Sequence, residues 1–226
     1  MYRNPLKIGV VDSGISSTFL RSTSVKVSAG AFFSLDFHKK TLNTFFCDGS
    51  DISSWREGVA TLGIDDKSGH GTAVTSIIYR NIPVPVEFYI AKILDEQQSG
   101  SALCLLAALH WLINDVKADC VNLSLGTDNW KVRRQMLELV EQAGARGCMI
   151  FSAAGDVPTL PSELTGVTAV GISRLSRNNN VGVKLDCIAL PSTVEIFQGN
   201  GWTTSEISTS YACPLVLSEY CAAMSR

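Results

Sequence analysis

The sequence predicts an α/β fold with a doubly wound, mainly parallel β-sheet and helices on both of its faces. Apolar runs too short for helices alternate along the 226-residue chain with longer segments of helical spacing. Hydrophobic residues make up 46% of the chain and charged residues 18%, a globular composition that can build a sizeable core. At this length we expect a single domain over residues 1–226.

The predicted strands are apolar runs bounded by turn residues. Leu6–Val11 is the first, a buried strand that ends at Asp12-Ser13-Gly14. The others are Val86–Leu94, Ala118–Leu125, Met149–Ala154, Val167–Ile172 and Val183–Leu190. Ligands of such sheets bind at the carboxyl ends of the strands, so we expect the functional site just after Val11, Leu125 and Ala154.

Between these strands, the apolar residues recur at helical spacing. The predicted helices are Gly71–Tyr79, Ser101–Lys117, Trp130–Arg146 and a final helix that begins near Thr209. Asp128 or Asn129 is suited to cap the third helix, and Gly147 is suited to stop it. Residues 19–60 follow no clear pattern and receive no assignment.

Composition excludes several function classes. The net charge is −2 and no stretch carries a basic run, so a nucleic-acid partner is not expected. The longest apolar run, Ala102–Ile113, is too short to span a bilayer, and the N-terminus has no signal-peptide pattern. The seven cysteines form no CxxC pair, which disfavours zinc and indicates buried thiols in a reducing compartment. We therefore expect a cytoplasmic protein without a membrane association.

Three segments together suggest nucleophilic serine chemistry. Asp12 ends a buried strand, His70 lies between two glycines where a helix begins, and Ser210 lies at the start of the last helix. A nucleophilic serine needs a base within hydrogen-bond reach and a carboxylate that orients the base. Glycines beside His70 permit close backbone approach. Pro214 follows Ser210 by four residues, and we expect it in the first helical turn, where no intrahelical N–H is required.

In this order of Asp12, His70 and Ser210, the sequence resembles the subtilisin-like serine proteases (subtilases). The resemblance extends to Val121–Gly126 and Phe151–Asp156 and implies the subtilisin-like fold and a peptide substrate bound as an added β-strand. The residues that it implies for pairing with the peptide are Ser99, Gly100, Ser101, Ser124, Leu125 and Gly126. Ala153, Ala154 and Gly155 match the wall of the specificity pocket. Asp156 and the Ser210 N–H match the oxyanion hole.

The sequence departs from the family pattern at four places. Ala73 replaces a second histidine, Ser208 replaces a glycine, and only residues 211–226 follow Ser210, which would leave the C-terminal helices to a partner domain. Asp156 replaces an asparagine that donates a hydrogen bond to the oxyanion. An ionised carboxylate has no donor, so Asp156 could help only if it were protonated, or if it turned away and left the Ser210 N–H to act alone. Burial after the strand Met149–Ala154 would favour the protonated form.

These features predict a cytoplasmic serine endopeptidase that processes a dedicated precursor peptide. Because Asp12 lies so near the start of the chain, we expect no N-terminal prodomain. No cofactor or metal is expected, because the connection over residues 80–85 has no room for an oxygen-rich calcium loop. The alternative is a catalytically weak or inactive pseudo-protease that binds peptides in the same groove. A nucleotide-binding protein is disfavoured, since no glycine-rich phosphate motif follows the first strand.

Overall fold

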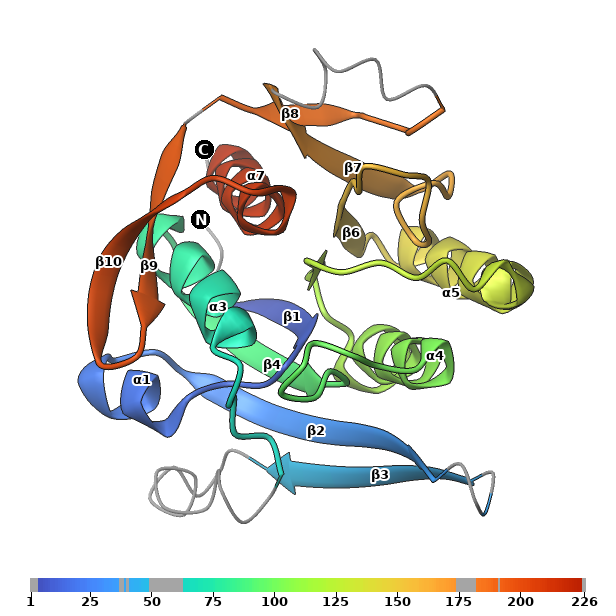
Figure 1. Cartoon of the computed structure of the whole chain (residues 1–226), viewed down its shortest axis with the longest axis horizontal. Coiled ribbons are helices and arrows are strands. Elements are labelled where there is room, and N and C mark those ends of the chain that lie inside the picture. The colour runs from blue at the N-terminus through green and yellow to red at the C-terminus, as the bar shows by residue number, and fades with distance from the viewer. Residues whose placement is uncertain are drawn as a thin grey trace.

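The core of the protein is an eight-stranded sheet with the strand order β3-β2-β4-β1-β5-β6-β7-β8 (Figure 1). The computed structural model describes residues 4–36, 39, 41–48, 63–173, 182–190 and 192–224. The strands are β1 (Leu6–Asp12), β2 (Val27–Asp36), β3 (Thr41–Asp48), β4 (Val86–Lys92), β5 (Cys120–Leu123), β6 (Met149–Ala153), β7 (Val167–Ile172) and β8 (Cys187–Ala189). Neighbouring strands pair in parallel except β2 and β3, which are antiparallel. The predicted doubly wound α/β fold is confirmed.

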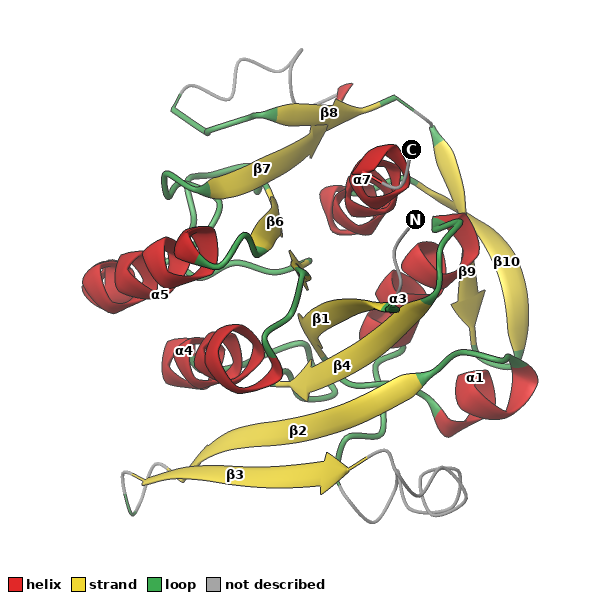
Figure 2. Cartoon of the chain, turned by 180° about the vertical axis from the view of Figure 1, so that it is seen from behind, coloured by secondary structure: helices red, strands yellow, loops and turns green. Residues whose placement is uncertain are grey.

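Helices cover both faces of this sheet (Figure 2). Helices α3 (His70–Asn81) and α7 (Thr209–Met224) pack against each other on one face. On the other face lie α4 (Ala102–His110), a π-helical segment (Trp111–Val116) and α5 (Arg133–Ala145). The single helix predicted over Ser101–Lys117 is therefore two segments of different winding, and it ends at Lys117 with a φ of 57°. As predicted, Asn129 caps the 3₁₀ turn that leads into α5.

Five elements were not predicted from the sequence. Strands β2 and β3 lie in the unassigned region 19–60, and helix α1 (Ser17–Ser22) extends into it. The other two are β9 (Thr193–Gln198) and β10 (Gly201–Glu206), which form a two-stranded hairpin whose β9 packs on α3. Gly199 and Asn200 connect two runs that are rich in β-forming residues. This pattern is a recognised hairpin signal and could have revealed the hairpin from the sequence.

The alternation of side chains along each strand divides the core into two layers. Ile8 and Val10 of β1 face the layer beneath α3 and α7, whereas Val11 faces the layer beneath α4 and α5. Successive side chains of a strand point to opposite faces, so Asp12 continues the row of Ile8 and Val10. The strand pattern thus delivers the Asp12 carboxylate to the side of the sheet where α3 begins.

The cysteines contribute to the packed interior of the protein. All seven cysteines are free thiols, and six of them are buried. Within the described residues, no helix is both long and apolar enough to cross a membrane.

Candidate active site

The candidate site lies where β1 and β5 end side by side at the middle of the sheet. The chain places β4 and β2 on one side of β1, and β5 to β8 on the other, so the strand order reverses between β1 and β5. Such a switch point is where parallel α/β sheets form their binding crevices. Asp12 is the last residue of β1, and Ser124 follows the last residue of β5.

Asp12 and His70 form the central contact of the site. The His70 Nδ1 lies 2.8 Å from Asp12 Oδ1, and the Ser13 backbone N–H donates to the same oxygen at 2.7 Å. Asp12 is fully buried, and its second oxygen has no hydrogen-bond partner among the described residues. A carboxylate can only accept here, so Nδ1 carries the proton and Nε2 remains free to act as an acceptor.

The environment of His70 favours its protonated form. Burial alone would lower the pKa of His70, but the hydrogen bond and charge of Asp12, together with the charge of Asp66, outweigh it. The pKa of His70 is therefore raised above its ordinary value of 6.5. Tyr211 stacks on the imidazole, with 6.0 Å between ring centroids, and further limits the orientation of the ring.

The two glycines beside His70 are required by the backbone, as predicted. Gly69 has a φ of 84°, a left-handed conformation that L side chains rarely adopt. At Gly71, a Cβ would lie 2.4 Å from the Gly14 carbonyl oxygen and 3.2 Å from the Asp12 Cβ. The start of α3 can therefore approach the end of β1 closely enough for His70 to reach Asp12.

A second buried carboxylate, Asp66, organises the loop before His70 and was not found from the sequence. It accepts hydrogen bonds from the Thr72 N–H at 2.7 Å, the Gly69 N–H at 2.8 Å and the Ser13 hydroxyl at 2.8 Å. Burial opposes its charge, but the hydrogen bonds from Thr72, Ser13 and Gly69 lower the pKa of Asp66 below its ordinary value. Its place shortly before a helix start is a capping signal that could have identified it.

A buried lysine joins the same loops to the neighbouring strand. Lys92 pairs with Asp12 in the register of β4 and β1 and is 8% exposed. Its ammonium donates to the carbonyl oxygens of Ser13 and Asp65. Burial lowers the pKa of Lys92, although the charges of Asp66 and Asp65 oppose the shift. Lys92 thus places a positive group near the carboxylates and joins the end of β4 to the two loops that contain Ser13 and Asp65.

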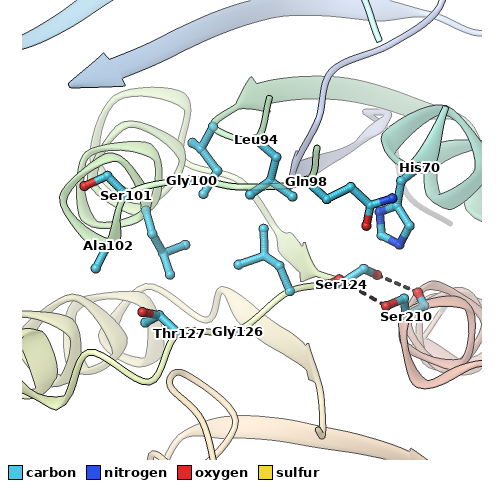
Figure 3. Close-up of a pocket in the computed structure, with 13 residues that line it drawn as sticks. His70, Leu94, Gln98, Gly100, Ser101, Ala102, Ser124, Gly126, Thr127 and Ser210 are labelled. Atoms are coloured by element: carbon cyan, nitrogen blue, oxygen red, sulfur yellow. Dashed lines mark hydrogen bonds between the residues drawn. The ribbon is translucent and has the colours of Figure 1, made fainter. Parts of the chain in front are cut away.

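Ser210 is held against Ser124 at the start of α7. The Ser210 hydroxyl donates to the Ser124 carbonyl oxygen at 3.2 Å, and the Ser124 hydroxyl donates to the Ser210 carbonyl oxygen at 2.6 Å (Figure 3). The Asn122 amide in turn donates to the Ser124 hydroxyl at 2.9 Å. The imidazole of His70 lies at the same end of the pocket as Ser210, above it in Figure 3.

The expectation that Pro214 lies in the first turn of the last helix is wrong. The helix begins at Thr209, so Pro214 lies in its second turn, where a backbone N–H would normally donate to the Ser210 carbonyl. Proline has no such N–H, and the Ser124 hydroxyl supplies the missing donor. The proline therefore frees the carbonyl that fixes α7 to the end of β5.

A cavity of about 260 Å³ connects these groups to the predicted peptide-binding segments. Gly100, Ser101, Ser124, Leu125 and Gly126 line it together with His70 and Ser210. Other predicted residues lie outside this lining: Ser99 borders a neighbouring cavity, Ala153 and Ala154 are buried in the core, and Gly155 is half-buried. Ser101 also caps α4 through its hydroxyl.

Asp156 is exposed to solvent. Its side chain therefore does not share the buried environment of β6 (Met149–Ala153), the strand that precedes it. Within the described part of the chain, no group of three or more histidine, cysteine, aspartate or glutamate side chains is arranged to hold a metal ion.

Comparison with known proteins gives two matches. The model of the subtilase family (peptidase S8) matches residues 3–223. A thermostable alkaline protease of Halalkalibacterium halodurans is 26% identical over 183 residues, which cover 75% of this chain and 42% of the relative. The chain thus matches less than half the length of that protease.

The contact between Ser124 and Ser210 gives a first prediction. Ser124→Ala should lower the free energy of unfolding by about 1 kcal/mol or more, because it leaves the Ser210 carbonyl without a donor. In a Pro214→Ala background the loss should be smaller, since the backbone N–H restored at position 214 can donate to that carbonyl. Urea unfolding of both single variants and the double variant measures the coupling; purely additive losses would contradict the compensation.

Proposed function

The chain belongs to the subtilase family, and we propose that it is a serine endopeptidase with Ser210 as nucleophile, His70 as general base and Asp12 as the group that orients the base. The observation that carries the proposal is the partly buried hydrogen bond between Asp12 and His70 at the end of a cavity that Ser210 also lines. It supports the proposal because nucleophilic serine catalysis requires a base that a carboxylate orients, close to the serine.

The proposed reaction begins when the Ser210 hydroxyl exchanges its hydrogen bond with the Ser124 carbonyl for one with His70 Nε2. Ser210 Oγ then attacks the peptide carbonyl while His70 takes its proton, and Asp12 stabilises the resulting imidazolium. The proton passes to the leaving amine as the peptide C–N bond breaks. Water then hydrolyses the acyl-enzyme with His70 again as base, which regenerates Ser210.

The backbone of Ser210 contributes to oxyanion stabilisation in this proposal. Ser210 is the second residue of α7, and N–H groups in a first helical turn lack intrahelical acceptors. Its N–H and the positive end of the helix dipole therefore favour the negative charge that develops on the substrate. Asp156 would add a second donor only in its protonated form.

The substrate of the proposed enzyme is a peptide in an extended conformation. Gly100–Ser101 and Ser124–Gly126 border the cavity, and their backbones offer hydrogen bonds to a peptide strand between them. We further propose that the enzyme is cytoplasmic and processes a dedicated precursor peptide. The free and mostly buried thiols support a reducing compartment.

A peptide-binding module without turnover is the second candidate. The observation that favours it is Asp156, since an exposed carboxylate at an oxyanion position would repel the developing charge. The two candidates share the cleft and differ in whether the Ser210 hydroxyl is activated.

Covalent labelling and point variants distinguish these candidates. We expect a fluorophosphonate probe to label Ser210, and Ser210→Ala, His70→Ala and Asp12→Ala each to reduce peptide hydrolysis by about 10⁴-fold or more. Their losses should be strongly non-additive, because the three groups act as one unit. Mass spectrometry of the labelled protein identifies the site. If the protein is folded and binds peptides but is not labelled, the result would instead support the non-catalytic peptide-binding module.

The raised pKa of His70 predicts the acid limb of the pH profile. His70 must be neutral to act as a base, so kcat/KM should rise with pH through a pKa above 6.5. Asp66→Asn removes one of the negative charges that raise this pKa, so the limb should move to lower pH. Asp65→Asn is the matched control, because Asp65 is not among the charges that shift His70. Equal profiles for wild type and Asp66→Asn would exclude this role for Asp66.

The exposed carboxylate of Asp156 gives a separate prediction. Asp156→Asn introduces an amide donor and removes a negative charge, so turnover at neutral pH should increase by up to about 10²-fold. Single-turnover kinetics of an ester and a peptide substrate measures the change. A large decrease would assign the carboxylate a positive role, and an unchanged rate would remove Asp156 from the oxyanion site.

A further inference from the structure

Two thiols, those of Cys120 and Cys221, lie in contact in the core, although 101 positions separate them in the sequence. Their sulfur atoms are 3.7 Å apart, and the two residues are only 4% and 2% exposed. The sulfur atoms of a disulfide are about 2.05 Å apart, so these two need to approach each other by less than about 2 Å. The fold thus brings the two thiols within reach of a covalent bond.

The two cysteines lie on the elements that also carry the candidate site. Cys120 is the first residue of β5, and Ser124 follows the last residue of that strand. Cys221 lies in the last turn of α7, and Ser210 is the second residue of that helix. The contact between the sulfurs and the hydrogen bonds between Ser124 and Ser210 therefore hold α7 to β5 at opposite ends of both elements.

The surroundings of the pair distinguish the two sulfurs. The Cys120 S–H donates a hydrogen bond to the Cys221 sulfur, which favours a thiolate on Cys221. This hydrogen bond lowers the pKa of Cys221 and raises the pKa of Cys120, while burial and the charge of Asp119 oppose the lowering at Cys221. Because the thiolate is the reactive form of cysteine, Cys221 is the sulfur that reacts first with an oxidant.

Cys221 is also the better placed of the two for a small oxidant. It lies just before Ala223 and Met224, which are exposed, whereas Cys120 belongs to a strand inside the sheet. The end of a helix opens locally at lower cost in free energy than a central strand does. Hydrogen peroxide is little larger than water, so a local opening of the last turn of α7 is enough to admit it.

We propose that Cys120 and Cys221 are an oxidisable pair, which hydrogen peroxide converts to a disulfide that crosslinks β5 to α7. The Cys221 thiolate attacks one oxygen of the peroxide, and the O–O bond breaks. A sulfenic acid forms, and the departing hydroxide takes up the proton that the Cys221 thiol had released, which gives water.

The second step closes the crosslink. The Cys120 sulfur attacks the Cys221 sulfur, the S–O bond of the sulfenic acid breaks, and the S–S bond forms. The hydroxyl group leaves with the Cys120 proton as a second water. The two thiols thus lose two electrons in total, and one hydrogen peroxide is reduced to two waters.

The crosslink should stabilise the folded protein. It closes a loop that spans 101 positions of the sequence, and a loop of this length strongly restricts the unfolded chain. The bond forms at the end of α7 that lies away from Ser210 and requires no reaction of the Ser210 hydroxyl. The inference therefore stands or fails independently of the proposed peptidase activity.

Peptide mapping of the wild-type protein tests the crosslink directly. The protein is treated with hydrogen peroxide, its remaining thiols are alkylated, and it is digested with trypsin without reduction. We expect the fragment of residues 118–131, which contains Cys120, to be joined to the fragment of residues 185–226. Because the second fragment holds two further cysteines, tandem mass spectrometry must assign the bond to Cys221. The absence of a crosslink, or a crosslink between other cysteines, would overturn the proposal.

Thermal unfolding measures the consequence of the crosslink. We expect peroxide to raise the Tm of wild type by about 5 °C or more, and dithiothreitol to reverse this rise. Cys120→Ala and Cys221→Ala should each abolish the rise. Cys148→Ala removes another buried thiol and is the matched control, which should keep it. A rise that persists in Cys221→Ala, or a crosslinked wild type whose Tm is unchanged or lower, would contradict the proposed stabilisation.

Discussion

The site depends on the Ser13 hydroxyl, which lies between two buried carboxylates. Its oxygen is 3.1 Å from Asp12 Oδ1 and 2.8 Å from Asp66 Oδ1, and it accepts the Gly71 N–H at 2.9 Å. One hydroxyl thus connects the end of β1, the loop before His70 and the first turn of α3. Two buried carboxylates this close would repel each other without donors, and the surrounding N–H groups and Lys92 offset that repulsion. The geometry of His70 follows from this network, because the residues that hold Asp66 also define where α3 begins.

The alternation of the parallel strands explains why these groups converge on one face. In β5, Cys120 faces the core layer beneath α7, and Asn122 and Ser124 continue its row towards the start of that helix. In β4, Phe88 and Ile90 face the same layer, and Lys92 follows them. Each row begins with apolar side chains that form the core and ends with a polar group at the carboxyl end of its strand. The same pattern therefore builds the core and positions the site, which couples the stability of the central strands to the site's geometry.

The parallel strands and the three proposed catalytic residues could be predicted because their signals are local. Buried central strands are continuous apolar runs, and the residues around Asp12, His70 and Ser210 form recognisable motifs. Strand β2 was missed because a register shift between Val27 and Ala29 disrupts its two-residue period, and β3 because Phe45 and Phe46 are both exposed at the sheet edge. The roles of Asp66 and Pro214 depend on partners distant in sequence, such as Ser13 and Ser124. The exposure of Asp156 depends on how the chain turns after Gly155, which no local pattern specified.

The cavity that His70 and Ser210 line also has an apolar part, formed by Leu94, Ala102 and Leu105. In the proposed endopeptidase, a peptide would gain binding energy from apolar contacts there and from main-chain hydrogen bonds along the cleft. Binding energy from such remote contacts can be used to orient the scissile bond, so truncated peptides should lose turnover as well as affinity. Under the proposed function, recognition of an extended segment in this way fits the processing of a dedicated precursor better than general protein degradation.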